Sequence, residues 1–202
     1  MPAAIDLCVL TDLKDWLGIP VATVTDDAKL NRLITSISQR ILTYLSRDAV
    51  VSASYTESYD GSGTSMQALL HYPITAVASL TINNGPILAS PDGVKSGYAF
   101  DIYALKLVGS PAAFMQGSFG TAGMFTKGFK NVTVTYTAGY AAIPTDINQA
   151  AIDWCSLRYR QRGWIGQTSK HIATGESVAF TPDAMPDNVR QALKPYRRLI
   201  PV

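Results

Sequence analysis

Histidines and cysteines, the side chains that most often bind metals, are few in this sequence of 202 residues. His71 and His171 lie far apart, and neither has a second ligand at helical spacing. Cys8 and Cys155 form no CxxC motif, and both lie among apolar residues, where a cysteine is usually a small core side chain in a reducing compartment. We therefore expect no metal centre.

The sequence also lacks a recognisable pattern for nucleophilic or acid–base catalysis. It contains no GxSxG motif, and Glu57 and Glu176 are its only glutamates. Two carboxylates that are distant in sequence can still meet in space, as they do in glycosidases. We consider three hypotheses for the function, and a hydrolase with a site in the middle of the chain is the weakest of them. We expect no catalytic residues.

The glycines do not form a nucleotide-binding loop. Gly123 and Gly128 have the spacing of the outer glycines of a P-loop, but Phe129 and Lys130 follow where Lys and Ser/Thr are required. The stretch GSFGTAG has the wrong glycine order for a dinucleotide fingerprint. We expect neither a nucleotide nor any other cofactor.

Basic residues close to aromatic residues are the strongest candidates for a binding function. Two groups occur late in the chain: Arg158, Arg160 and Arg162 with Tyr159 and Trp164, and Lys194, Arg197 and Arg198 with Tyr196. Such groups can hold a phosphate backbone, so a soluble DNA-binding accessory factor is the second hypothesis. We favour solvated or subunit-bridging side chains instead, because Arg158 and Arg162 share a helix face while Arg160 points elsewhere.

The density of charged residues divides the chain into three parts, whose helices and strands must position the candidate binding residues. The middle part, 51–139, carries four basic and four acidic residues, a lower density than in 1–50 or 140–202. Apolar residues at steps of three and four predict helices in the first and last parts. Alternating apolar residues predict strands in the middle part.

Two helices are predicted in the first part. Thr11 is expected to cap a short helix that ends near Gly18, with Leu13, Trp16 and Leu17 turned inward. Thr25 is expected to cap a longer helix with one apolar stripe, made of Leu30, Leu33, Ile34, Ile37, Ile41 and Leu45.

The middle part is predicted to form an antiparallel sheet. The stretches SASYTESYD, ITAVASLTI and NVTVTYT alternate as strands do, and YAFDIYALKLV fits one or two more strands. The Gly- and Ala-rich stretch 109–128 has no clear period and predicts a long loop, which in an assembly protein can reach a neighbouring subunit.

Gly139 and Pro144 are predicted to form a structural junction between the last strand and the next helix. Gly139 provides a backbone bend that other residues resist, and Pro144 fixes the start of the helix. Asp146 already complements the positive helix N-terminus, so no phosphate site is expected there. A last helix is predicted from Pro186 to Lys194.

These elements predict an α+β fold in a single domain over 1–202. The N- and C-terminal parts are expected to form a small helical bundle, with an antiparallel β-sheet segment inserted between them.

The order of the elements and several motifs resemble the head–tail connector (adaptor or head-completion) family of tailed bacteriophages. The most specific part is VTYTAGYAAIPTDINQAAIDWCSLRYRQR, in which a valine-rich strand, YTAGY, IP and a helix ending in LRY occur together. The stretch YDGSGTSMQALLHYPITAVASLTI is similar to the strand pair that often precedes this part.

The resemblance implies a structural virion protein and not an enzyme. Members of the family form a ring of about a dozen subunits between the portal and the tail, extend the DNA channel and dock the next connector or tail protein. The implied partners are further copies of the chain, the portal protein, a tail or second connector protein, and DNA passing through the lumen. The implied location is the head–tail junction of the virion, after assembly in the host cytoplasm and without a membrane. Candidate subunit-interface or DNA-facing residues are Arg158, Arg160, Arg162, Arg197 and Arg198.

Overall fold

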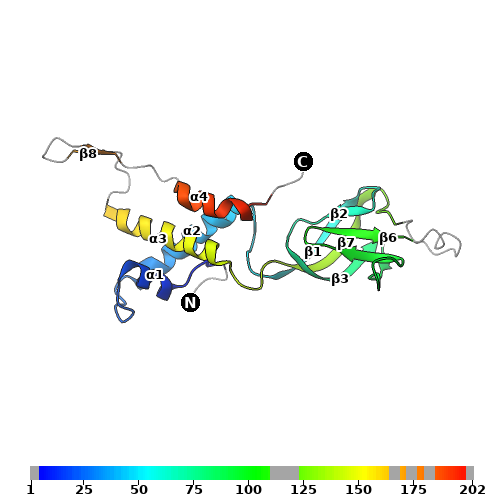
Figure 1. The fold of residues 1–202 in the computed structure, drawn as a ribbon, viewed down its shortest axis with the longest axis horizontal. Coiled ribbons are helices and arrows are strands. Elements are labelled where there is room, and N and C mark those ends of the chain that lie inside the picture. Colours follow the sequence, from blue (N-terminus) through cyan, green and yellow to red (C-terminus); the bar gives the residue numbers. More distant parts are fainter. Residues whose placement is uncertain (1–4, 110–122, 164–168, 172–176, 180–184, 199–202) are drawn as a thin grey trace. The chain divides into compact units, whose positions relative to one another are not determined.

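The structure, a computed structural model, describes residues 5–109, 123–163, 169–171, 177–179 and 185–198. The chain divides into two compact units, which we call the helical unit (1–48 and 143–202) and the β unit (49–142). The predicted α+β class is confirmed, because the described residues combine α-helices with antiparallel sheets (Figure 1). None of the described helices has the length and apolar composition that a membrane span requires.

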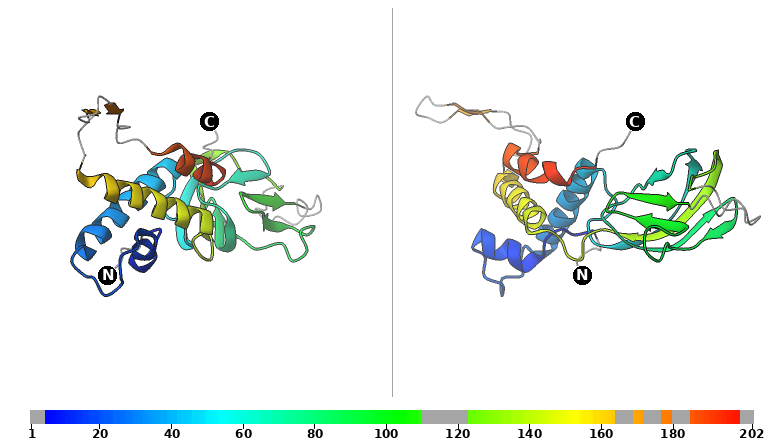
Figure 2. Two further views of the ribbon diagram at one scale, coloured as in Figure 1. Left: turned by 60° about the vertical axis from the view of Figure 1, so that its left-hand side comes forward. Right: turned by 45° about the vertical axis from the view of Figure 1, so that its right-hand side comes forward.

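Segments from both ends of the chain build the helical unit. Its α-helices are α1 (Leu10–Leu17), α2 (Asp27–Leu45), α3 (Thr145–Arg160) and α4 (Asp187–Leu193). Helix α3 packs against α1, α2 and α4, so the N- and C-terminal segments share one core (Figure 2). As predicted, α3 begins directly after Pro144. The chain between α3 and α4 contributes a short antiparallel hairpin of β8 (Ser169–His171) and β9 (Ser177–Ala179).

The apolar stripe predicted on α2 is confirmed as the face that enters this core. Leu33 is half-buried and the other five members are buried, namely Leu30, Ile34, Ile37, Ile41 and Leu45. The expectation for Trp16 of α1 is wrong, because 53% of its surface is exposed. Helix α1 is only eight residues long, and Leu13 and Lys14 occupy its buried face.

Both N-terminal helices begin without the side-chain caps that the sequence predicts. Val9 and Asp26 hold the N-cap positions in place of Thr11 and Thr25, and neither side chain makes a capping hydrogen bond. The predicted end of α1 is confirmed, because Gly18 adopts the left-handed conformation with a φ of 70°.

A buried lysine holds the loop between α1 and α2. Lys14 is 2% exposed, and its ammonium group donates to the carbonyls of Val21 at 3.2 Å and Thr23 at 2.9 Å. The same nitrogen lies 2.5 Å from a carboxylate oxygen of Asp27. Two hydrogen bonds and one ion pair thus offset the cost of burying the ammonium charge.

Replacing this lysine tests how far it fixes the loop. Lys14→Met is expected to lower the free energy of unfolding by about 3–5 kcal/mol, because it removes the cation that pairs with Asp27 and leaves two carbonyls without their donor. Lys29→Met is the matched control: Lys29 contacts Asp26 at 2.8 Å, but its side chain is 68% exposed, so a loss under about 1 kcal/mol is expected. Urea denaturation measures both losses, and similar small values for the two variants would contradict the assigned role.

The β unit consists of two antiparallel sheets around one apolar core. The strand order is β1-β7-β3-β4 in one sheet and β2-β6-β5 in the other. The strands are β1 (Ala53–Gly61), β2 (Met66–Ala68), β3 (Ile74–Ile82), β4 (Gly85–Ile87), β5 (Gly97–Phe100), β6 (Ala104–Val108) and β7 (Gly128–Ala138). As their alternation predicts, Val132, Val134 and Tyr136 of β7 are fully buried in this core.

The stretch 109–128, predicted to be a long loop, partly belongs to this core. Residues 110–122 lie outside the part that the structure describes. Phe125 is fully buried, and its backbone accepts from Gly63 at 2.7 Å and donates to Thr64 at 2.8 Å. The end of the stretch is therefore anchored beside the turn that follows β1.

The two ends of the β unit meet at Gly139. Its N–H donates to the carbonyl of Pro73 at 2.9 Å, and its φ of 122° is one that L side chains rarely adopt. A Cβ at this position would lie 2.8 Å from both the backbone nitrogen and the Cα of Ser52. Tyr140 then donates to Val50 at 3.0 Å and accepts from Ser52 at 2.9 Å. The outgoing chain is thus held directly against the incoming chain.

Substitution of Gly139 is expected to destabilise the protein more than substitution of another left-handed glycine. Gly139→Ala should cost about 3 kcal/mol or more, because the backbone strain of about 1–3 kcal/mol is joined by a clash with neighbouring backbone. Gly93→Ala is the control: Gly93 has a φ of 72° but nothing within 4 Å of an added Cβ, so about 1 kcal/mol is expected. Urea denaturation compares the two variants, and equal losses would show that the close approach at Gly139 is unimportant.

Candidate functional site

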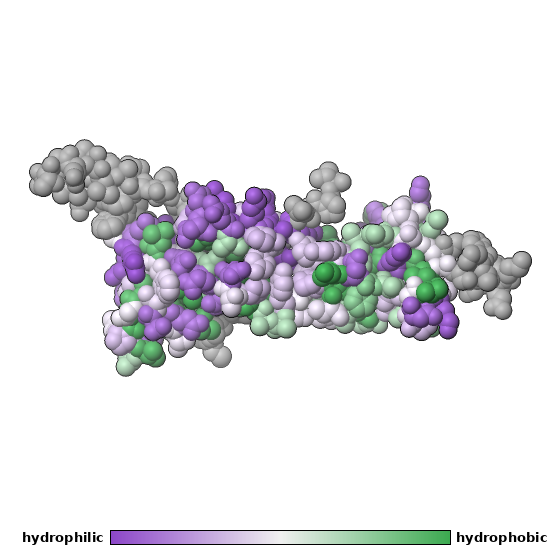
Figure 3. All heavy atoms as spheres, viewed as in Figure 1, coloured by the Kyte–Doolittle hydropathy of each residue, from purple (hydrophilic) through white to green (hydrophobic). Residues whose placement is uncertain are grey.

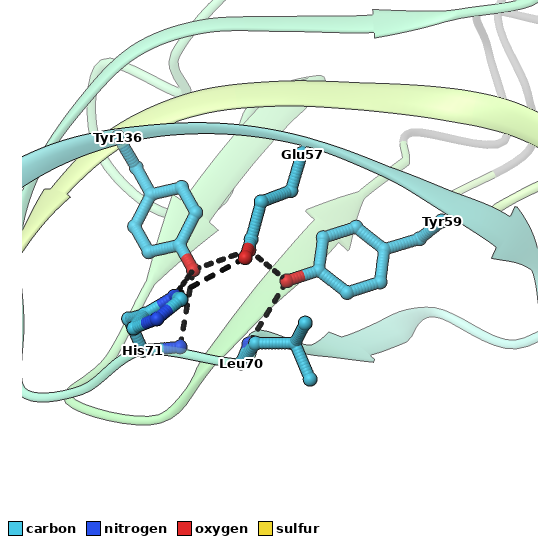
Figure 4. A network of polar contacts seen from close by, with 5 residues as sticks. All are labelled: Glu57, Tyr59, Leu70, His71 and Tyr136. Carbon is cyan, nitrogen blue, oxygen red and sulfur yellow. Dashed lines mark hydrogen bonds and ion pairs between the residues drawn. The ribbon is translucent and has the colours of Figure 1, made fainter. Parts of the chain in front are cut away.

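A carboxylate, a histidine and two phenols meet in the β unit (Figure 4). Glu57 and Tyr59 are two positions apart in β1, so their side chains lie on the same side of the strand. Tyr136 of β7 donates to Glu57 at 2.6 Å, and Tyr59 donates to the same carboxylate. His71, in the segment before β3, places its Nδ1 3.1 Å from Glu57. This is the grouping of side chains in the described residues that most resembles catalytic machinery.

Each phenol of this network also accepts a backbone N–H group. The N–H of Leu70 donates to Tyr59 at 2.9 Å, and that of His71 donates to Tyr136 at 3.1 Å. Tyr55 stacks on the His71 ring with 3.7 Å between the ring centres. The network therefore fastens the segment before β3 to β1 and β7.

The protonation of the phenols indicates a structural role for the network. Burial raises the pKa of Tyr59 and Tyr136 well above the ordinary tyrosine value, and their hydrogen bonds to Glu57 raise it further. Both phenols are therefore neutral donors at physiological pH, and the Glu57 carboxylate is occupied by them and by His71. Glu176, the other glutamate of the hydrolase hypothesis, lies outside the described residues. Within the described part of the chain, no three potential ligands group as a metal site would require.

Tyr136→Phe is expected to change how stability depends on pH. Because the phenol pKa is raised in the folded state, the folded protein retains protons that the unfolded chain loses above about pH 10. The stabilisation that comes from these retained protons is complete below about pH 10 and is lost as the pH rises. The free energy of unfolding then falls by up to about 1.4 kcal/mol per pH unit for each phenol. Between about pH 10 and 11.5, the free energy of unfolding of Tyr136→Phe should fall less steeply with pH than that of the wild type, which urea denaturation can measure.

At neutral pH the same variant should lose about 1–3 kcal/mol, because a partly buried carboxylate and a backbone N–H lose their partner. Tyr103→Phe is the control, since that side chain is 58% exposed and lies outside the network. An alkaline slope that is equal in Tyr136→Phe and the wild type would contradict the account.

The first arginine group lies at the C-terminal end of α3, and its Arg162 is already engaged within the chain. The guanidinium of Arg162 lies 4.0 Å from the centre of the Tyr159 ring and donates to the Tyr159 carbonyl at 2.8 Å. The Tyr159 hydroxyl donates to Asp26 at 2.6 Å. The hydrogen bonds of Asp26 with Lys29 and Tyr159 lower the pKa of its carboxyl group. Basic and acidic groups therefore alternate on this surface, where Arg160 is exposed.

The second arginine group lies at the other end of α3. The N–H of Arg198 donates to the carbonyl of Leu45 at 2.9 Å, and the hydroxyl of Tyr196 donates to Asp146 at 3.1 Å. Buried Arg47 donates from Nε to the Tyr196 carbonyl at 3.1 Å. The segment that carries Arg197 and Arg198 is thus fixed near the start of α3.

The structure does not bring the two arginine groups together. At about 1.5 Å per residue, Asp146 and Arg158 are about 18 Å apart along α3, so the groups lie at opposite ends of this helix. Trp164, which the sequence placed with the first group, lies outside the described residues.

A surface turn between β5 and β6 is a further candidate that sequence reasoning missed. One carboxylate oxygen of Asp101 accepts from the N–H groups of Tyr103 at 2.7 Å and Ala104 at 2.8 Å, which fixes the turn. Ile102 is 52% exposed and Tyr103 is 58% exposed. An aspartate between apolar residues is the only sequence feature that could have indicated such a turn.

Comparison with known families identifies the chain. A model of the head completion protein family matches residues 6–199. The chain belongs to the head completion protein family. It is therefore a structural protein of the phage head–tail connector type, and the resemblance inferred from its motifs is confirmed. No curated protein matches the sequence.

Solved structures of this architecture come from gene transfer agent (GTA) particles. The fold is similar to a chain in the neck of an empty GTA particle computed with C6 symmetry, with a TM-score of 0.57, 16% identity, and coverage of 100% of this chain and 95% of that chain. A chain in the neck of a native GTA particle computed with C12 symmetry also has a TM-score of 0.57 and 16% identity, with 100% and 94% covered. At this identity the similarity shows a shared fold along the whole head completion chain.

Proposed function

We propose that this protein forms an oligomeric ring between the portal and the tail of a phage-type particle. The ring extends the DNA channel and docks the next connector or tail protein. The observation that carries the proposal is the family match over 6–199, together with a fold shared with chains of particle necks that were computed with C6 and C12 symmetry. The protein would act in the virion, after assembly in the host cytoplasm, and without catalysis.

The apolar turn at Ile102 and Tyr103 suits a contact between subunits. Hydrophilic side chains dominate the visible surface around α4, whereas apolar side chains are visible on the β unit (Figure 3). The turn is tied to the segment before β3 and to the start of β3, because Leu69 donates to Tyr103 at 3.2 Å and Ile74 donates to Ile102 at 3.0 Å. A turn that is already fixed loses little entropy when it binds.

A ring also requires that each subunit use two different surfaces, one for each neighbour. The mixed charges around Arg158, Arg160 and Arg162 suit the second of these surfaces better than a phosphate backbone, because Arg162 already stacks on Tyr159 beside the carboxylate of Asp26. Arg160 and Arg197 are exposed, and they are the side chains through which lumenal DNA would be contacted.

Assembly on heads that contain a portal but lack this protein tests the proposed contact. Ile102→Asp combined with Tyr103→Asp should abolish ring formation and head joining, while the melting temperature stays within a few degrees of the wild type because both side chains are exposed. Val94→Asp is the matched control, since Val94 is 76% exposed on the same unit and lies outside the turn.

The results of these assays distinguish a wrong subunit contact at Ile102 and Tyr103 from a wrong function. Normal head joining by the double variant would place the subunit contact elsewhere. A wild-type protein that neither forms a ring nor binds portal-bearing heads would overturn the ring itself. Tight binding of random duplex DNA by the monomer, with affinity falling steeply as salt rises, would favour the DNA-binding hypothesis instead.

A further inference from the structure

Strand β1 is a long, open edge of the four-stranded sheet. In the strand order β1-β7-β3-β4 it has a partner on one side only. On its other side, the described residues make no backbone hydrogen bond with it. The N–H and C=O groups on that side are therefore available to a strand from another chain.

The other edges of the β unit are short or covered. Strand β4, at the opposite edge, has three residues with Pro86 in the middle, and β2 also has only three residues. The outer edge of β5 is covered, because Tyr98 donates to Leu88 at 3.0 Å and accepts from Ser90 at 2.8 Å. Strand β1, in contrast, has nine residues and contains neither proline nor lysine, the residues that commonly protect an edge.

The hydrogen bonds of β7 show which backbone groups of β1 face the open edge. The carbonyl of Asn131 accepts from the N–H of Asn83, directly after β3, at 2.8 Å. The carbonyl of Thr137 accepts from the hydroxyl of Thr75 in β3 at 3.1 Å. Because backbone groups alternate in direction along a strand, the residues of β7 that face β1 are Val132, Val134 and Tyr136. The residues of β1 that lie opposite these and face β7 in turn are Tyr59, Glu57 and Tyr55.

The backbone N–H and C=O groups of Ser54, Thr56 and Ser58 therefore point away from β7, to the open edge. The side chains of these three residues are exposed, small and uncharged. The hydroxyls of Thr56 and Ser58 are already hydrogen-bonded to those of Thr135 at 3.1 Å and Thr133 at 3.2 Å. A strand that approaches this edge thus meets neither charge nor bulk, and few hydroxyl groups would lose a partner.

The hairpin of β8 and β9 is a strand pair that lacks a larger sheet. Its two strands form a sheet of their own with three residue pairs, and no third strand joins them among the described residues. A two-stranded hairpin is at best marginally stable in water, so it gains stability when it pairs with a further strand. The hairpin belongs to the helical unit, whereas β1 belongs to the β unit.

We propose that β1 is a strand-acceptor site, to which the β8–β9 hairpin of a second copy of the chain adds through backbone hydrogen bonds. The addition of a strand to an open sheet edge is an established mode of protein recognition. This inference rests on the proposed ring and names one of its contacts. Because each copy carries both the acceptor and the donor, on different surfaces, successive copies join head to tail until the ring closes. Pairing of two β1 strands with each other would instead be isologous and would end at a dimer.

Amide hydrogen exchange, resolved to single residues by mass spectrometry, tests the acceptor site without requiring a ring. The full chain is studied at a concentration where it is monomeric, with and without a synthetic peptide of residues 168–180 in large excess. With the peptide, the amides of Ser54, Thr56 and Ser58 should exchange about tenfold more slowly or less. The amides of the alternate residues should be slow in both samples, namely Tyr55, Glu57 and Tyr59. A peptide with Val178→Pro is the control and should have no effect, because proline lacks the N–H that the hairpin or its edge needs.

Thr56→Pro tests the same edge during assembly on portal-bearing heads. Proline removes an N–H that points away from β7, so the pairing of β1 with β7 should persist, as a cooperative melting transition can verify. The protein concentration needed for half-maximal head joining should rise about tenfold or more. Thr56→Ala is the matched control: it also loses the hydroxyl but keeps the N–H, so it should join heads like the wild type.

Three results would overturn the proposal. The first is unchanged exchange of the β1 amides at saturating peptide. The second is slow exchange of Ser54, Thr56 and Ser58 in the isolated monomer, since the edge would then be closed within one chain. The third is head joining by folded Thr56→Pro that equals that of Thr56→Ala. If the peptide slows exchange but the wild type forms no ring, the strand contact stands and the proposed function fails.

Discussion

The fold depends on the closure of the β unit at Gly139. The β unit is inserted between two segments that must return to one helical bundle, so its two ends have to leave at the same place. Strands β1 and β7 meet this requirement by pairing antiparallel, with Ala53 opposite Ala138. Only a residue without a Cβ allows the backbone after β7 to lie against Ser52. Because of this closure, α2 and α3 can pack in the same core although the β unit separates them in sequence.

The polar groups buried in both units serve mainly to hold chain segments in place. Lys14 satisfies the carbonyls of the α1–α2 loop, and Glu57 gathers two phenols and a histidine around the segment before β3. The same residue types at similar distances occur in active sites, but here the donors occupy the carboxylate and the phenols remain neutral. Fixed loops and turns of this kind suit a protein whose function is to present surfaces to its neighbours.

The sequence allows the elements to be predicted because their periodicity is local. The stripe on α2 and the alternation of Val132, Val134 and Tyr136 follow directly from which positions must face a core. Contacts between distant segments do not have such a signature. Trp16 is exposed because α1 is short and its buried face is already occupied. Phe125 is buried because its backbone bonds to Gly63 and Thr64 hold it at the core of the β unit. The two arginine groups look alike in sequence, but they lie at opposite ends of α3. The hydrogen bond between Tyr196 and Asp146 holds the second group near the start of this helix. Family membership was accessible from motifs, whereas the network around Glu57 required the fold.

The central claim is that this head completion protein works as a ring at the portal vertex. Electron microscopy of DNA-filled, portal-bearing heads incubated with the purified wild-type protein tests it most directly. The account predicts added ring-shaped density of rotational symmetry at the portal vertex, and no such density on heads that lack a portal. Heads that remain unchanged at saturating protein, while the protein itself stays monomeric in native mass spectrometry, would contradict it.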